Sequence, residues 1–376
     1  MLRKSLPKIT ILIALCANLA ATPASAQATP AGEVDVTKCW SYPSAGEGGS
    51  EFVSDGMRLY LDGSGGRVQA LSLGGEKLWA SEFGGDIDSN LLAAETGLFL
   101  ATSTLASETN KSAGNLLRSL SKETGITSWT AKLADSSEYF LGTYQSSIVV
   151  VSKNGIIQSI DAKTAAVKWK REIAGGFAAE PRFFAEKLVV ASTAKQVFTI
   201  SLATGEIDSV RKLPFQVSAV GRTAAGDLIV GDERGNLTSF AVSTEKVNWK
   251  FRSGGEISSV IAIDDHILVT SHDNFAYSIV TKNGSVAWKR RLAGRVSRVA
   301  TFEDRYALIS GFDDHVAVLS DLTDGKIAGQ IGFGDDETLI YRPIISSGLI
   351  FIMTGSYVRA FSLNGCPAKK QSGPGK

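Results

Sequence analysis

The sequence lacks several features that would assign it to a familiar class of protein. Positive and negative side chains nearly cancel, with 39 Lys and Arg against 38 Asp and Glu, and no arm of the chain is dense in cations. Nothing in the charge therefore points to nucleic acid. Apolar residues make up 44% of the 376 positions, which excludes a largely disordered or collagen-like chain.

The local signatures of common catalytic chemistries are also missing. The sequence contains no H-E-x-x-H, G-x-S-x-G, G-x-x-x-x-G-K-[ST] or C-x-x-C pattern, which mark zinc, serine-hydrolase, P-loop and thiol-redox sites. The nearest approach to a metal site is His266 and His272, which flank one expected strand near Asp264, Asp265 and Asp273. Asp and His are common in solvated turns, so we favour that interpretation. We expect no catalytic, cofactor-binding or metal-binding residues.

Residues 1–26 have the parts of a secretory signal peptide. A basic start at residues 3–8 precedes an apolar run over 9–21, and small residues at 24–26 form a cleavage site. We therefore expect export to the periplasm of a bacterium, at most peripheral to the outer membrane.

No membrane anchor is expected. Leu15 precedes Cys16, where a bacterial lipoprotein signal needs a small residue, so lipid anchoring is disfavoured. No later stretch reaches the ~18 uninterrupted apolar residues of a membrane helix. We expect a flexible segment over 27–36 and a disordered tail over the Gly, Pro and Lys of 367–376.

The tryptophans recur along one column of a repeat. Each repeat has an alternating strand, a turn that usually contains Gly, and a short strand that carries the column residue. A period near 40 residues with several short strands per unit predicts an all-β fold, an eight-bladed β-propeller of four-stranded blades over 37–366. The column contains Trp40, Trp79, Trp129, Trp169, Trp249 and Trp288, with Ser209 and Gly329 at its two other positions.

The two ends of the repeat array complement each other. The last unit has its third strand at 357–363 but no fourth, whereas an isolated Trp strand stands at 37–42. Pairing these two strands closes the ring and removes its exposed sheet edges. The pairing places Cys39 near Cys366, and export favours a disulfide between them over two free thiols.

The repeat resembles the docking motif of the PQQ-like, or quinoprotein-type, β-propeller family. The string from an Asp-like residue through Thr-Gly to Trp recurs over 121–129, 161–169 and 241–249, with partial forms elsewhere. The resemblance covers about 39–366, and it implies that the six tryptophans pack between neighbouring blades as structural residues.

The resemblance also implies two kinds of function. Some members are dehydrogenases that hold PQQ with calcium, and others are non-enzymatic periplasmic propellers, the best known of which is a subunit of the outer-membrane β-barrel assembly machine. This sequence has no Cys-Cys pair and little beyond the blades. We therefore expect a monomeric scaffold without cofactor that binds such a protein partner. A small PQQ- and calcium-dependent dehydrogenase is the alternative, and a ligand-binding envelope sensor is the second.

Partner contacts are expected on the loops around the mouth of the central channel. Those loops follow each Trp strand and lead into the next innermost strand, and they carry paired glycines and polar residues. Six cations also lie within 17 residues, from Lys289 to Arg305, and could meet an acidic partner. An ordinary charged face is the competing interpretation. The candidate contacts are Asp86, Asp88, Glu256, Arg290, Arg291, Arg295, Arg298 and Asp336.

Overall fold

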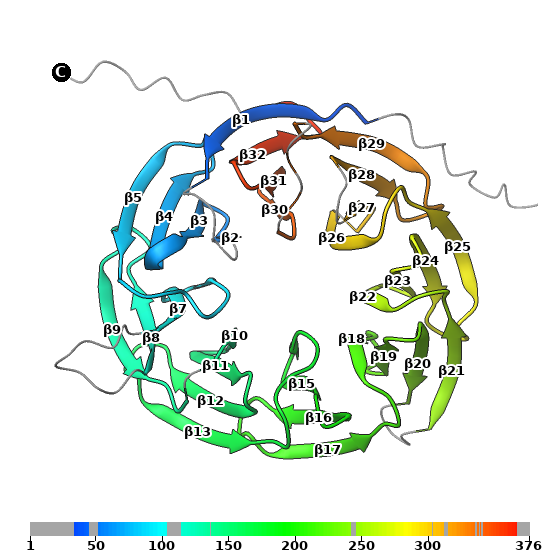
Figure 1. Cartoon of the computed structure of the whole chain (residues 1–376), viewed down its shortest axis with the longest axis horizontal. Helices are drawn as coiled ribbons and strands as arrows, with labels where there is room; N and C mark the ends of the chain where they lie inside the picture. The colour runs from blue at the N-terminus through cyan, green and yellow to red at the C-terminus, as the bar shows by residue number, and fades with distance from the viewer. Residues whose placement is uncertain are drawn as a thin grey trace, which may run out of the picture. The chain divides into compact units, whose positions relative to one another are not determined.

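Eight four-stranded antiparallel sheets form a closed ring in the computed structural model of this chain (Figure 1). The structure describes residues 34–44, 52–103, 114–135, 137–241, 246–302, 304–311, 315–334, 337, 339 and 341–366, without the side chains of 297 and 298. The expected signal peptide and the expected C-terminal tail lie outside these residues. The predicted eight-bladed all-β propeller is confirmed.

Each blade runs from an innermost strand to an outermost strand. Blades 1 to 4 contain β2 (Phe52–Ser54), β3 (Arg58–Gly63), β4 (Arg67–Ser72) and β5 (Lys77–Glu82), with the 3-10 turn Ser64–Gly66; β6 (Leu92–Ala94), β7 (Gly97–Ser103), β8 (Asn115–Leu120) and β9 (Thr127–Lys132); β10 (Tyr139–Tyr144), β11 (Ser147–Ser152), β12 (Ile156–Asp161) and β13 (Val167–Glu172); and β14 (Arg182–Phe184), β15 (Lys187–Ser192), β16 (Gln196–Ser201) and β17 (Ile207–Lys212).

The second half of the ring repeats this order. Blades 5 to 8 contain β18 (Val217–Arg222), β19 (Leu228–Asp232), β20 (Asn236–Phe240) and β21 (Val247–Arg252); β22 (Ile257–Ile263), β23 (His266–Ser271), β24 (Phe275–Val280) and β25 (Val286–Arg291); β26 (Val296–Phe302), β27 (Tyr306–Gly311), β28 (Val316–Asp321) and β29 (Ile327–Gly332); and β30 (Ile344–Ser346), β31 (Leu349–Met353) and β32 (Tyr357–Ser362) with β1 (Thr37–Pro43).

The cores lie between neighbouring blades. In blade 3, every residue of β11 is buried, because both faces of that sheet are covered. Val149 and Val151 of β11 pack with Leu188 and Val190 of β15, the corresponding strand of blade 4. Burial of such apolar faces is the main force that holds the blades together. The described part of the chain contains no helix with the length and hydropathy needed to span a membrane.

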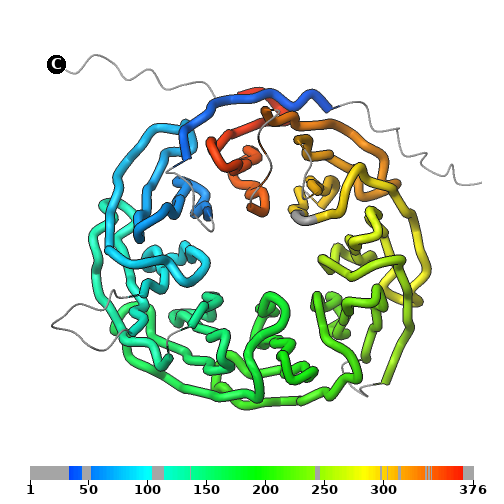
Figure 2. The backbone as a smooth tube through the Cα atoms, viewed as in Figure 1, coloured from blue at the N-terminus to red at the C-terminus, as the bar shows by residue number. Residues whose placement is uncertain are grey.

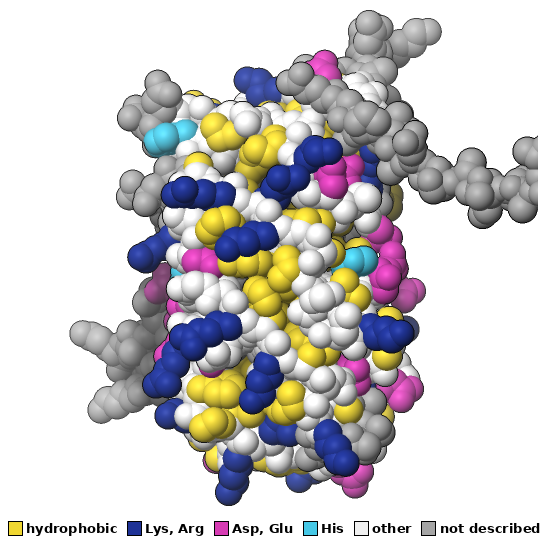
Figure 3. All heavy atoms as spheres, turned by 90° about the vertical axis from the view of Figure 1, so that its right-hand side faces the viewer, with side chains coloured by type: hydrophobic (Ala, Val, Ile, Leu, Met, Phe, Trp, Pro, Cys, Tyr) yellow, Lys and Arg dark blue, Asp and Glu magenta, His cyan; other side chains and the backbone are white. Residues whose placement is uncertain are grey.

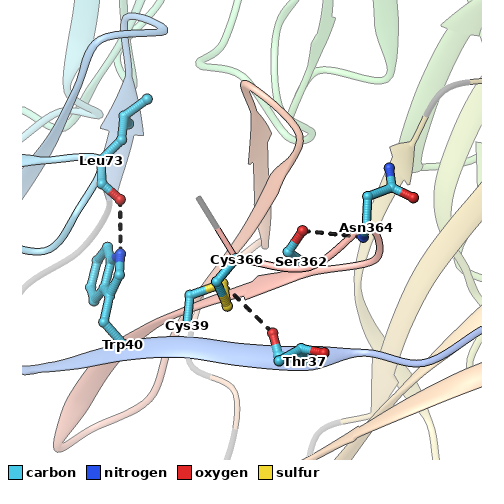
Figure 4. The surroundings of a disulfide bond; sticks show 7 residues. All are labelled: Thr37, Cys39, Trp40, Leu73, Ser362, Asn364 and Cys366. Atoms are coloured by element: carbon cyan, nitrogen blue, oxygen red, sulfur yellow. Dashed lines mark hydrogen bonds between the residues drawn. A yellow bond between two sulfur atoms is a disulfide. The ribbon is translucent and has the colours of Figure 1, made fainter. Parts of the chain in front are cut away.

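Strand β1 closes the ring as the outermost strand of blade 8. It pairs antiparallel with β32, with Trp40 opposite Ala360. Cys39 and Cys366 form a disulfide with their Cα atoms 5.3 Å apart and 327 positions apart in sequence, next to the indole of Trp40 (Figure 4). The predicted closure and the predicted disulfide are both confirmed.

The chain just before β1 also belongs to the packed ring. The Val34 amide donates to the Ala328 carbonyl of β29 at 2.7 Å, and Val34 and Val36 pack against the core between blades 7 and 8. Figure 2 shows the first described residues running along the outside of these two blades. Ordered packing therefore starts before residue 37, inside the segment that we expected to be flexible.

Candidate functional site: the rim and the central channel

The joint between blades is built around the tryptophan column. Each indole N–H donates to a backbone carbonyl in the turn between the third and fourth strands of the next blade. In addition, the turn glycine of that blade lies against the ring in five of the six joints. The six hydrogen bonds are Trp40 to Leu73, Trp79 to Lys122, Trp129 to Ala162, Trp169 to Leu202, Trp249 to Thr281 and Trp288 to Leu322, at 2.7–3.1 Å.

The rim loops occupy the predicted place, between the outermost strand of one blade and the innermost strand of the next. Asp86 is exposed and Asp88 is half-buried in the loop from β5 to β6. The Asn115 amide donates to the Asp88 carboxylate at 3.0 Å. Burial raises the pKa of Asp88, and repulsion from Asp86 and Glu138 raises it further. The rim from blade 1 to blade 3 therefore carries an acidic stretch.

Glu256 lies on the rim between blades 5 and 6. His272 Nδ1 is 3.2 Å from its carboxylate, and the Asp273 carboxylate accepts from the Gly254 amide at 2.7 Å. His266 is paired instead with Asp265, at 2.6 Å. Within the described residues, no group of three or more His, Cys, Asp or Glu side chains could hold a metal ion.

The predicted arginines are spread over two blades. Arg290 and Arg291 are exposed on β25, the outermost strand of blade 6, and Arg290 donates to the Asp324 carbonyl of blade 7 at 3.1 Å. Arg295 is exposed in the rim loop that follows. The Arg298 side chain lies outside the described residues. Arg290 and Arg291 therefore lie on the outer wall of the ring, which the outermost strands form, whereas Arg295 lies on the rim.

Cations also occur on the wall itself. Figure 3 shows Lys and Arg side chains along its whole height, with hydrophobic side chains between them. Exposed cations on an outermost strand discourage pairing of that strand with another chain.

The last predicted rim residue, Asp336, lies outside the described residues. Its neighbour Glu337 accepts from Arg359 at 2.5 Å and from Thr354 at 3.1 Å. Both side chains of the Glu337–Arg359 pair are largely buried. This pair ties Glu337, in front of blade 8 along the chain, to β32.

An ion triad crosses the central channel. Arg342, which precedes β30 of blade 8 in the sequence, donates to the Glu180 carboxylate at 2.8 Å. Glu180 precedes β14 of blade 4 in the sequence, and blade 4 lies on the opposite side of the ring from blade 8 (Figure 1). Glu180 also forms an ion pair with Arg182 of β14 at 3.2 Å. Burial lowers the pKa of Arg182, and the neighbouring Glu180 opposes that change.

Glu180 and Arg342 of the triad line a channel cavity of about 580 Å³. Apolar side chains form much of the wall, among them Phe52, Leu92, Phe140 and Val299.

Sequence analysis missed this triad. Glu180 and Arg342 are 162 positions apart, so no local pattern connects them. The available signal is that each is a charged residue next to a proline, Pro181 or Pro343, just before an innermost strand. Such residues line the channel once the blades are assembled.

The residues of this cavity do not fit PQQ with calcium. Calcium takes six to eight oxygen ligands, many of them from carboxylates. Glu180 lines the cavity and is paired with two arginines, while the Asn90 amide is bonded to the backbone of Leu141 through both its oxygen and its nitrogen. Recruiting these groups as ligands would leave Arg182 and Arg342 without their carboxylate.

Comparison with known proteins shows the family. The model of the family described as outer membrane protein assembly factor BamB matches residues 113–211 and 214–365, more than half of the chain. The chain belongs to this family. The outer membrane protein assembly factor BamB of Shewanella oneidensis is 24% identical over 310 residues, which cover 74% of this chain and 75% of that protein.

Solved structures share the fold. The crystal structure of BamB from Moraxella catarrhalis has a TM-score of 0.67 at 15% identity and covers 87% of this chain and 98% of that one. Quinohemoprotein alcohol dehydrogenase from Comamonas testosteroni has the same TM-score of 0.67 at 9% identity, covering 90% and 78%. At these identities the likeness extends to the fold alone, since one propeller fold carries both kinds of protein.

Proposed function

We propose that this protein is a non-enzymatic periplasmic scaffold that binds a component of the outer-membrane β-barrel assembly machinery. Membership of the BamB family carries the proposal. The channel supports the non-enzymatic part of the proposal. Glu180, which a calcium site there would need as a ligand, is already paired with arginines from two opposite blades. A rigid ring that presents loops around its rim is suited to holding protein partners.

The partner contact is proposed on the rim. Asp86 and Glu138 are exposed, and each repels the half-buried carboxylate of Asp88. A basic partner surface would relieve this repulsion, so the rim from blade 1 to blade 3 favours a cationic face of the partner. Glu256 and Arg295 extend the proposed contact around blades 5 to 7. Charges of this kind set the rate and specificity of association more than its affinity.

Affinity purification from envelope extract tests this role. Tagged protein should recover a β-barrel assembly subunit, and an Asp86→Lys, Glu138→Lys variant should recover several-fold less. A matched control, Lys250→Glu, Lys289→Glu, changes two charges on the outer wall and should leave recovery unchanged. Failure to recover any such subunit, with normal outer-membrane protein levels in a deletion strain, would remove the proposal.

A second assay addresses the enzymatic alternative. Purified protein is given PQQ and Ca²⁺, and a bound quinone spectrum and dye reduction with alcohols or aldose sugars are measured. We expect neither signal. Observing both would replace the scaffold with a quinoprotein dehydrogenase.

A further inference from the structure

The outer wall of blades 5 and 6 is cationic. Its two strands, β21 and β25, carry no carboxylate and five exposed cations, which are Lys250, Arg252, Lys289, Arg290 and Arg291. With the turns before these strands, over 241–252 and 281–291, the sequence has seven cations against one acidic residue, Glu245, which lies outside the described residues. This part of the wall therefore has a positive potential.

Two carboxylates reach this wall from turns of blades 5 and 7, and both have partners. The Asp227 carboxylate accepts from the Asn248 amide of β21 at 2.9 Å. The Asp324 carboxylate is paired with Lys326 at 2.7 Å. The excess of positive charge remains when both carboxylates are counted. Protection of a sheet edge does not account for it, since the outermost strand β9 of blade 2 has a single cation.

A cavity of about 370 Å³ lies beside Lys250 and Arg252. Their cross-strand partners on β20, Thr238 and Asn236, also line it, and Phe215 from the loop before blade 5 adds an aromatic face. None of the described residues that line the cavity is acidic. Neither cation forms an ion pair with a residue that the structure describes, so both are available to an anion.

Blade 6 shows why this cavity exists in blade 5. At the same register, blade 6 has Phe275 and Tyr277 where blade 5 has Asn236 and Thr238. In blade 6 the ammonium of Lys289 lies over the Phe275 ring, 3.8 Å from its centroid. The shorter polar side chains of blade 5 provide no such ring. The two blade 5 cations therefore stand beside an open space.

The chemistry of the cavity suits a phosphate group. The guanidinium of Arg252 has a planar fork of donors that matches phosphate oxygens, and the ammonium of Lys250 adds a second positive charge. Phe215 provides an apolar surface next to these two groups. A phosphate that adjoins an apolar body would satisfy both parts of the cavity.

Exposed apolar side chains lie among the cations of the wall. Val247 and Val286 begin β21 and β25 and are 46% and 45% exposed. Figure 3 shows hydrophobic side chains between Lys and Arg side chains on this side of the ring. A soluble acidic partner would need only the cations, whereas an anionic bilayer presents phosphates directly above apolar chains. The mixture therefore favours a lipid surface.

We propose that the outer wall of blades 5 and 6 docks on a bilayer that contains anionic lipid, and that the cavity beside Phe215 receives a headgroup phosphate. Lys250 and Arg252 bind the phosphate, and Val247 and Val286 contact the boundary between headgroups and acyl chains. A bilayer on the wall leaves the rim loops free. The proposal does not depend on the scaffold function, since vesicle binding needs no protein partner.

Co-sedimentation of the purified protein with lipid vesicles tests the docking. One set of vesicles is phosphatidylcholine alone, and the other is phosphatidylcholine with phosphatidylglycerol in equal amounts. The protein should partition onto the anionic vesicles at least tenfold more strongly, because each Lys or Arg near an anionic surface adds to the binding. Added salt should weaken this binding. Equal partitioning onto both sets would overturn the proposal.

Neutral substitutions locate the contact. Lys250→Gln, Arg252→Gln should lower partitioning onto anionic vesicles at least tenfold, with an unchanged melting temperature. The matched control, Lys132→Gln, Lys170→Gln, removes two exposed cations from the outer wall of blades 2 and 3 and should leave partitioning within about twofold. Equal losses in the two variants would mean that net charge alone attracts the protein, and would contradict a specific docking face.

Two soluble anions separate a lipid from other ligands. Inorganic phosphate and poly-glutamate are titrated into the protein by calorimetry. Binding to the anionic vesicles that exceeds binding to both soluble anions supports the lipid proposal. Binding of phosphate without vesicle binding would assign the cavity to a free anion, and binding of poly-glutamate without vesicle binding would assign the wall to an acidic protein. Either result would overturn the proposal.

Discussion

Gly125 of blade 2 lies against the indole of Trp79 of blade 1, so close that a Cβ atom on Gly125 would come within 2.4 Å of the ring. The Trp79 indole donates to the Lys122 carbonyl of the same turn at 2.9 Å. The turn is therefore held between a hydrogen bond and a flat ring face. Gly125 also has a φ of +71°, which a residue with a side chain adopts at a cost.

Replacing Gly125 by Ala should destabilise the protein by about 2–4 kcal/mol, because it adds overpacking against Trp79 to backbone strain. Gly348→Ala is the matched control, since Gly348 has a similar φ of +74° but no atom within 4 Å of the added Cβ. The control should cost only about 1 kcal/mol. Urea unfolding of both variants gives the comparison, and equal losses would mean that the indole exerts no steric pressure on the turn.

Reduction of the disulfide should weaken the closure of the ring. The bond between Cys39 and Cys366 spans 327 positions, so the chain-entropy model gives it about 6 kcal/mol. Dithiothreitol should lower the melting temperature of the wild type to that of the Cys39→Ser, Cys366→Ser variant, and should not affect the variant. A wild type that melts at the same temperature with and without reductant would contradict this expectation.

Asp88→Asn should raise stability at neutral pH by about 0.5 kcal/mol. The raised pKa of Asp88 means that its ionised form is less favourable in the fold than in the unfolded chain, so ionisation costs stability above the folded pKa. Below the ordinary value of 3.8 the carboxyl is protonated in both states and this cost disappears. The advantage of the variant should therefore vanish as pH falls from 7 to below 3.8 in thermal melts. An advantage independent of pH would rule out the electrostatic cause.

Removing the Glu180 carboxylate should cost more stability than removing the Arg342 guanidinium, which reaches it from the opposite side of the channel. Glu180→Ala leaves Arg182 and Arg342 to repel each other and should cost about 2 kcal/mol, whereas Arg342→Ala leaves the Glu180–Arg182 pair intact and should cost less than about 1 kcal/mol. Chemical unfolding of the two single variants and the double variant gives the coupling energy. A coupling near zero would show that the contact across the channel contributes nothing to the ring.

The repeat determined most of what could be predicted about the fold. The column of eight positions from Trp40 to Gly329 predicted the blade count, because each blade needs one joint with the next. The ends of the array gave the closure, since an unpaired Trp strand at one end and a missing fourth strand at the other complete one sheet. Both inferences rest on a pattern that is local to each repeat.

The features that sequence analysis missed depend on the assembled ring. Glu180 and Arg342 meet only because their blades stand opposite each other, and Val36 reaches Gly329 only because the segment before β1 runs along β29 of blade 7. Residues close in sequence can also be separated by the assembled ring: Arg290 lies on the outermost strand of blade 6, and Arg295 lies in the rim loop that follows.

Site-specific photo-crosslinking in living cells tests the central claim of a scaffold that binds through its rim. A photoreactive amino acid at Asp86 or Glu138 on the rim is compared with one at Lys250 or Lys289 on the outer wall. We predict crosslinks to a β-barrel assembly subunit from the rim positions and none from the wall positions. Crosslinks from the wall alone, or from neither set in cells that fold the protein normally, would contradict the account.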